Sequence, residues 1–70
     1  MKRTAAERLR AAIADAERQG VTRYAIARDA GLAKQTVIEL AEGRTEPSLA
    51  TAEAVAGVLG LDIDFRKRTR

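Results

Sequence analysis

The sequence of 70 residues lacks cysteine and histidine, and it has one proline, one tyrosine, one phenylalanine and no tryptophan. These absences exclude disulfide bonds, cysteine–histidine zinc sites and catalysis by a thiolate or an imidazole. The carboxylates are scattered along the chain, and no nucleophile is matched with a base. We therefore expect a protein that is not an enzyme, with no catalytic residues, no metal and no cofactor.

Long hydrophobic runs are also absent. No apolar stretch approaches the ~18 residues that indicate a membrane-spanning helix, and no apolar signal segment follows the basic residues near the start. These absences predict a cytoplasmic protein without a membrane partner.

Alanine is abundant, with fifteen residues, whereas aromatic residues make up 3% of the chain. Many small residues and few large ones predict a thin, closely packed core, and alanine favours helices. A chain of this length forms one domain at most, and it buries only about 60% of the surface that its unfolded state exposes. The net charge of +3 fits either a nucleic-acid partner or simple solubility.

Two helices are predicted in the first half of the chain. The first begins at the capping box Thr4–Glu7 and ends at Gly20. The second is about two turns long, begins at Thr22 and ends at Gly31. The apolar stripe of the first helix consists of Ala6, Leu9, Ile13 and Ala16.

Two more helices are predicted in the second half. The third runs from Lys34 to Glu42, and Ala33 stands where a capping side chain is usual, a loss of about 1 kcal/mol. The fourth begins after Ser48 and runs to Leu59. In it, Leu49, Ala52, Ala56 and Leu59 are expected to form the core side. Val55 and Val58 are then left on a flank that a small monomer does not cover.

The hydrophobic period changes to two after the fourth helix, which indicates a strand over residues 61–66. Because the chain offers no second strand, we expect pairing with the same strand of a second copy. The alternative is an extended tail that lies over its own core. The expected homodimer interface consists of Val55, Val58, Leu61, Ile63 and Phe65.

A spacing pattern links the second and third helices. It starts at Arg23 and requires a small fifth residue for close helix crossing, a glycine at the ninth position for a positive-φ turn, and apolar residues that fix the crossing angle. All seven positions agree: Ile26, Ala27, Ala30, Gly31, Leu32, Val37 and Leu40.

Together with Gly43, the pair Pro47 and Ser48 and the pair Leu59 and Gly60, this pattern resembles the phage-repressor-like (Cro/cI, XRE) helix-turn-helix transcriptional regulators over about residues 21–65. The resemblance implies an all-α, compact four-helix domain like that of lambda repressor, spanning 1–65 with its helix-turn-helix core at 22–42, followed by a basic tail at 66–70. The short C-terminal β-strand expected above would be paired across a dimer.

The resemblance also implies which residues contact DNA, because the third helix of this family lies in the major groove. The implied base-reading residues are Lys34, Gln35, Thr36 and Glu39. The implied contacts to the DNA backbone are Thr22, Arg23, Arg44 and Thr45. The residue types fit independently, since lysine can bind guanine, glutamine adenine, and glutamate the amino group of cytosine. The alternative for each is a solvated helix face.

We therefore expect sequence-specific binding of double-stranded DNA at a pseudo-palindromic operator by a homodimeric transcriptional regulator, a repressor. The alternative function is that of an antitoxin-like or adaptor protein whose main role is to bind a partner protein such as a toxin, with DNA binding for autoregulation. The basic tail either follows phosphates beside the operator or is a solubilising end.

Overall fold

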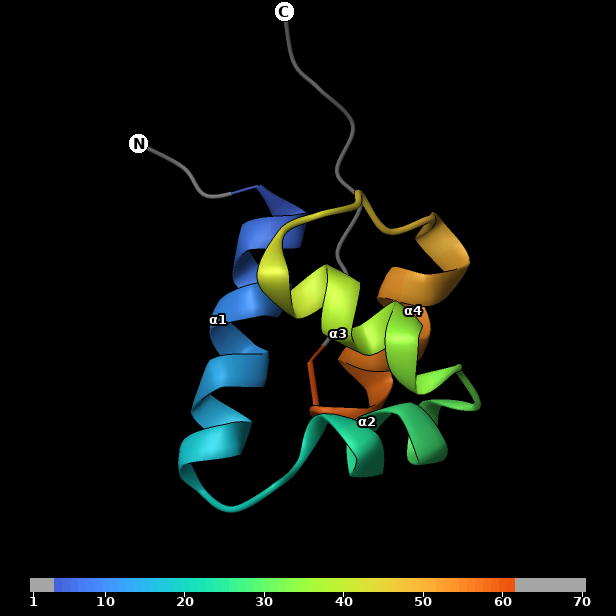
Figure 1. Ribbon diagram of the computed structural model, residues 1–70. Helices are drawn as coiled ribbons and strands as arrows, with labels where there is room; N and C mark the ends of the chain where they lie inside the picture. The colour runs from blue at the N-terminus through green and yellow to red at the C-terminus, as the bar shows by residue number, and fades with distance from the viewer. Residues whose placement is uncertain (1–3, 62–70) are drawn as a thin grey trace, which may run out of the picture.

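The computed structural model describes residues 4–61, which form four α-helices. Their bounds are α1 Ala5–Arg18, α2 Arg23–Ala30, α3 Lys34–Glu42 and α4 Leu49–Val58. The expected all-α class and helix order are confirmed (Figure 1). Residues 62–70 lie outside the described residues. They include the basic tail and all of the expected strand over residues 61–66 except Leu61. No helix in the described range is long and apolar enough to cross a membrane.

Three of the four helices begin with a side-chain cap. In α1 the Thr4 hydroxyl accepts a hydrogen bond from the Glu7 backbone N–H at 3.1 Å, and the Thr4 N–H donates to the Glu7 carboxylate at 2.7 Å. Thr22 and Ser48 cap α2 and α4 in the same way through their hydroxyl oxygens. Ala33 takes the N-cap position of α3 without a side-chain hydrogen bond, as the sequence predicted.

The turn between α2 and α3 depends on Gly31. Its φ of 72° lies in the left-handed region, which only glycine enters without strain. The Leu32 N–H then donates to the Ala27 carbonyl at 2.8 Å, which closes the C-terminus of α2. The chain can therefore reverse within a few residues and start α3 against α2.

The core is formed by two or three apolar residues from each helix. Ile13 of α1, Ile26 of α2, Val37 and Leu40 of α3 and Val55 of α4 are the largest fully buried side chains. The other buried members are alanines and Leu9, so the helices approach closely around a thin core. The thin, closely packed core that the alanine-rich composition predicts is therefore present in the described residues.

The expected uncovered flank of α4 is not present, and the placement of Val55 at a dimer interface is wrong. Val55 is 0% exposed, and Val58 packs partly buried against the core. The reason is that α4 contacts both α1 and α2, so its inward face is wider than a single stripe. Conversely Leu49, expected in the core, is 55% exposed at the first turn of α4.

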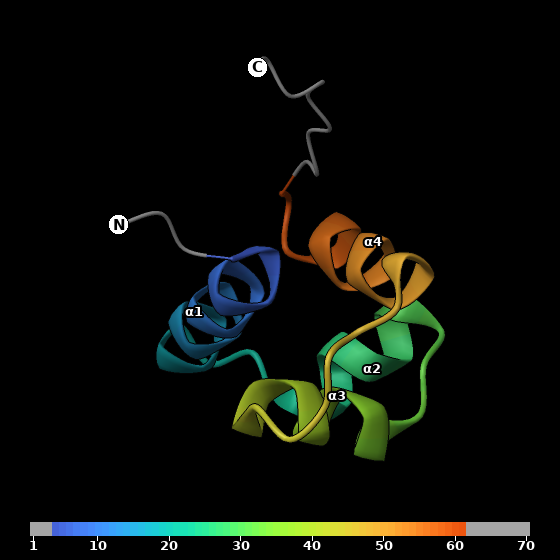
Figure 2. The same cartoon turned by 90° about the horizontal axis from the view of Figure 1, so that it is seen from above.

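The helices leave one side of α3 open. Helix α3 packs against α2 and α1, whereas α4 lies on the other side of the molecule (Figure 2). The buried residues of α3 are Val37 and Leu40. Ala41 packs partly buried against the core as well, and the side of α3 opposite these residues faces away from it.

Candidate nucleic-acid interface

The open side of α3 carries the four residues expected to read bases. Lys34 and Gln35 are exposed, while Thr36 and Glu39 are half-buried beside the core residues. Within the described part of the chain, none of these four side chains makes a hydrogen bond or an ion pair. Their donors and acceptors are thus available to an external partner. Ile38 of the same helix is also half-buried.

Lys34 differs from the other cations of residues 21–46, all of which the structure describes. Arg28 pairs with Asp29 at 3.1 Å, and Arg23 and Arg44 also have carboxylate partners. Lys34 has no such partner in this range. It is therefore the cation of this segment whose charge is least compensated.

Arg23 and Arg44, expected at the DNA backbone, meet at Glu42, the last residue of α3. The Arg44 Nε lies 3.0 Å from one Glu42 carboxylate oxygen, and the Arg23 Nη1 lies 3.7 Å from the other. The Arg23 Nε also donates to Glu17 of α1 at 3.1 Å. The sequence pattern indicated the two cations but not the carboxylate that joins them.

The two threonines expected at the DNA backbone lie in different settings. Thr22 is the N-cap of α2, where its hydroxyl oxygen accepts from the Ala25 N–H at 3.0 Å. Its hydroxyl hydrogen is not used in that bond and can donate to a phosphate oxygen. Thr45 is exposed in the connection between α3 and α4.

The start of α3 offers backbone donors as well. Because Ala33 supplies no side-chain acceptor, the N–H groups of the first turn are not capped by a side chain. Such donors, together with the helix dipole, favour a phosphate oxygen near a helix N-terminus. The same feature weakens α3 as an isolated helix.

Arg10 of α1 holds the opposite end of α3, and the sequence interpretation missed this role. Its Nε donates to the Leu40 carbonyl at 3.0 Å. The position that a β-carbon would take at Gly43 lies 3.5 Å from this nitrogen, so the guanidinium lies against the start of the following loop. A weaker contact of 3.9 Å reaches Glu46. Arg10 thus fixes the C-terminus of α3 on α1.

One sequence signal could have identified Arg10. It lies four residues after Ala6 and directly after Leu9, at the edge of the apolar stripe of α1. A long side chain at the edge of such a stripe can lay its stem along the neighbouring helix and use its head group there. The pattern does not specify which carbonyl it would reach.

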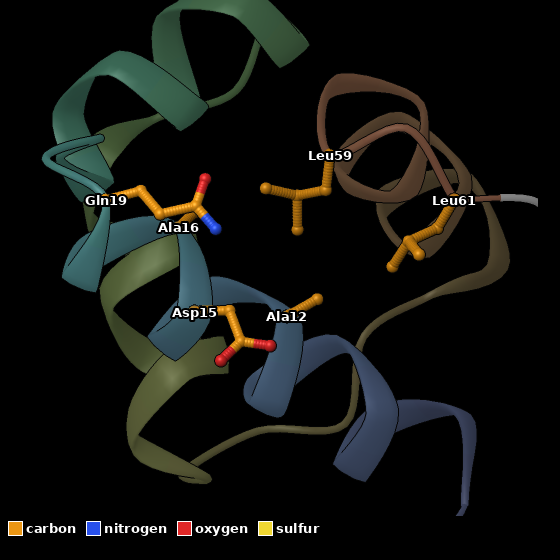
Figure 3. A pocket seen from close by; sticks show the side chains of 6 residues that line it. All are labelled: Ala12, Asp15, Ala16, Gln19, Leu59 and Leu61. Carbon is orange, nitrogen blue, oxygen red and sulfur yellow. The ribbon is translucent and has the colours of Figure 1, made fainter.

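A shallow pocket lined by both apolar and polar side chains lies between α1 and the end of α4, away from α3. Its volume is about 210 Å³. Figure 3 shows Leu59 directed toward the small residues of α1, with Leu61 at the other edge. The lining residues are Ala12, Asp15, Ala16, Gln19, Leu59 and Leu61. Of the expected dimer residues, Leu61 is 41% exposed here, while Ile63 and Phe65 lie outside the described residues.

Within residues 4–61, no group of three or more acidic side chains is arranged to hold a metal ion. The chemistry available at α3 is that of hydrogen bonding and charge, which suits recognition of a polar, anionic surface.

Comparison with known proteins agrees with this geometry. The model of a protein family described as helix-turn-helix matches residues 14–66, most of the chain. The match covers all of α2, α3 and α4 and the end of α1. No curated protein and no solved structure gives a significant match.

Proposed function

Because the chain belongs to the helix-turn-helix family of DNA-binding transcription regulators, we propose that it is a homodimeric repressor that recognises a pseudo-palindromic operator. The observation that carries this proposal is the outer surface of α3. The four side chains expected to read bases are polar and make no hydrogen bond or ion pair within the described residues, whereas Val37 and Leu40 on the inner side are buried. A helix presented in this way fits the major groove.

Base reading is assigned to Lys34, Gln35, Thr36 and Glu39. Lys34 can donate to guanine O6 and N7, and Gln35 can form two hydrogen bonds with adenine. Glu39 can accept from the amino group of cytosine, which also offsets its repulsion from nearby phosphates. Thr36 offers a methyl group to thymine and a hydroxyl to either neighbour. Specificity then rests on about one and a half turns of helix.

Contacts to the DNA backbone are assigned to the start of α2 and to the loop after α3. Thr22 and Arg23 belong to the first, and Arg44 and Thr45 to the second. These contacts would orient α3 without reading sequence. The segment 21–46 has four cations and four anions, so binding depends on how these charges are distributed rather than on a net positive charge.

Dimerisation is assigned to the surface at the end of α4. The pocket between α1 and α4 and the exposed Leu61 provide apolar area there. Val58, Ile63 and Phe65 remain candidates for this interface. This proposal requires that two copies joined here place their α3 helices in successive major grooves, about 34 Å apart.

The same apolar surface favours a second candidate function. A partner protein could bind the pocket while α3 stays free for DNA, which is the arrangement expected of an antitoxin-like or adaptor protein. Copurification of a second chain, lost on Leu61→Asp, would favour this function over the homodimer. Light scattering at micromolar concentration would distinguish them, because the homodimer doubles the mass of 7.6 kDa.

The decisive experiment is selection from a randomised duplex library with the wild type and with Gln35→Ala. We expect an inverted repeat to be enriched, and we expect Gln35→Ala to lose preference at one symmetric base position. Binding without any sequence preference, sensitive only to salt, would contradict the assignment of α3 as the reading helix.

A further inference from the structure

The carboxylate of Glu42 contacts the two arginines that the proposed function assigns to phosphates. We infer that Glu42 restrains DNA binding by holding Arg23 and Arg44 in ion pairs with which phosphate oxygens must compete. This inference rests on the proposed function, because it concerns the strength of that same interface.

The two carboxylate oxygens of Glu42 contact different arginines. One carboxylate oxygen lies 3.0 Å from the Arg44 Nε, and the other lies 3.7 Å from the Arg23 Nη1. The side chain of Arg44 is 67% exposed and that of Arg23 is 31% exposed, so a phosphate can reach both guanidinium groups through solvent. Arg23 is held a second time by Glu17, which leaves Arg44 as the more easily released of the two.

Glu42 is in an electrostatically unfavourable place for an acidic residue. It is the last residue of α3, where the helix dipole disfavours a negative charge. A carboxylate beside a DNA backbone also repels phosphate. The two arginines compensate this charge in the free protein, so their own charge is partly cancelled before DNA arrives.

The expected effect on affinity follows from the strength of exposed ion pairs. Each such pair changes an equilibrium constant by about two- to fivefold. Two pairs are released when Glu42 is neutralised, and one like charge is removed from the vicinity of the phosphates. Glu42→Gln should therefore bind DNA about tenfold more tightly at low salt.

The salt dependence should change as well. The slope of log affinity against log salt is about −0.9 for each phosphate that the protein neutralises. Glu42 cancels one positive charge of this arginine pair, and Glu42→Gln restores it. We expect the slope of Glu42→Gln to be steeper by about one phosphate, a change that altered packing alone would not produce.

The experiment measures fluorescence anisotropy of a labelled mixed-sequence duplex at a series of salt concentrations. Glu53→Gln is the matched control, because it makes the same change in net charge on the exposed side of α4, where Glu53 has no ion pair within the described residues. We expect Glu53→Gln to stay within about twofold of the wild type. Equal gains from both substitutions would overturn the inference, since net charge would then explain them.

A double-mutant cycle tests whether the gain depends on the arginines. In a background carrying Arg23→Gln and Arg44→Gln, Glu42→Gln should change affinity by less than about twofold. An undiminished tenfold gain in that background would overturn the inference. A folding defect cannot mimic the expected result, because it would weaken binding rather than strengthen it.

Failure of this inference and failure of the proposed function give different results. If the wild type selects an inverted repeat and Glu42→Gln binds equally or more weakly, Glu42 does not restrain binding and the proposed function stands. If neither protein binds any duplex at low salt, the proposed function fails and the inference fails with it.

Discussion

Helices α3 and α4 use their surfaces in opposite ways. Helix α4 is apolar around most of its circumference, is capped by Ser48, and buries Val55 between α1 and α2. Helix α3 has one buried stripe, no capping side chain, and a polar outer surface. Helix α4 therefore contributes mainly stability. Helix α3 depends on its neighbours for support, and its exposed Lys34 and Gln35 side chains make no hydrogen bond or ion pair within the described residues.

The largest effect should come from a charge placed in α4. Val55→Asp buries a carboxylate without a partner in the centre of the core, which should cost more than about 3 kcal/mol and unfold the domain. Circular dichroism during thermal unfolding measures this loss. Leu49→Asp on the same helix is the control, and its 55% exposure predicts a change within about 0.5 kcal/mol. Similar losses from both would mean that α4 is not packed as described.

A substitution on the polar surface of α3 should lower DNA affinity without lowering stability. Gln35→Ala should weaken binding to the selected operator by about 1–3 kcal/mol, because a two-bond contact to a base is lost. The melting temperature should not fall, since Gln35 is exposed and makes no hydrogen bond within the described residues. Titration calorimetry and thermal unfolding together check both parts. A stability loss equal to the affinity loss would show that Gln35 supports the fold instead.

Arg10 belongs to α1 but supports α3 through its hydrogen bond to the Leu40 carbonyl. Arg10→Met keeps most of the apolar stem but removes the donor to the Leu40 carbonyl, which should cost about 1–2 kcal/mol of stability. Operator affinity should fall as well, through misplacement of α3 rather than through a lost phosphate contact. The slope of log affinity against log salt should therefore stay unchanged.

Arg10→Lys provides a comparison for this prediction. It retains a charge but cannot reproduce the planar donor geometry of the guanidinium. We expect it to recover only part of the stability. A salt slope that becomes shallower by one phosphate in Arg10→Met would instead identify Arg10 as a direct DNA contact.

The smallest expected effect is a gain. Ala33 already has N-cap backbone angles, with φ −67° and ψ 142°, so Ala33→Ser can supply the missing cap without strain. Stability should rise by about 1 kcal/mol, as measured by urea unfolding. Ser48→Ala on α4 is the converse substitution and should lose a similar amount. No gain from Ala33→Ser would mean that the start of α3 is stabilised by other contacts.

The helices could be predicted from local signals. Thr4, Thr22 and Ser48 cap helices where a hydroxyl precedes an apolar pattern, and Gly31 ends α2 where the chain needs a positive φ. These signals act over three to five residues, so a linear sequence contains them completely. The polar face of α3 was predictable for the same reason, because the buried positions of a helix imply the exposed ones.

The inward face of α4 could not be predicted in this way. A helix that is apolar nearly all round has no unique buried side, and only the positions of α1 and α2 decide that Val55 is buried and Leu49 exposed. Val55 is therefore removed from the proposed interface, whereas the exposed Leu61 stays a candidate for it.

The four helices, the turn at Gly31 and the residues that α3 presents could be predicted from the sequence, because each follows from short-range backbone and periodicity rules. The partners of the long charged side chains, in contrast, depend on the tertiary structure. Arg10 binds the Leu40 carbonyl, and Glu42 joins Arg23 to Arg44. Such contacts join separate helices or reach beyond a helix end, and they depend on packing geometry that no local pattern encodes.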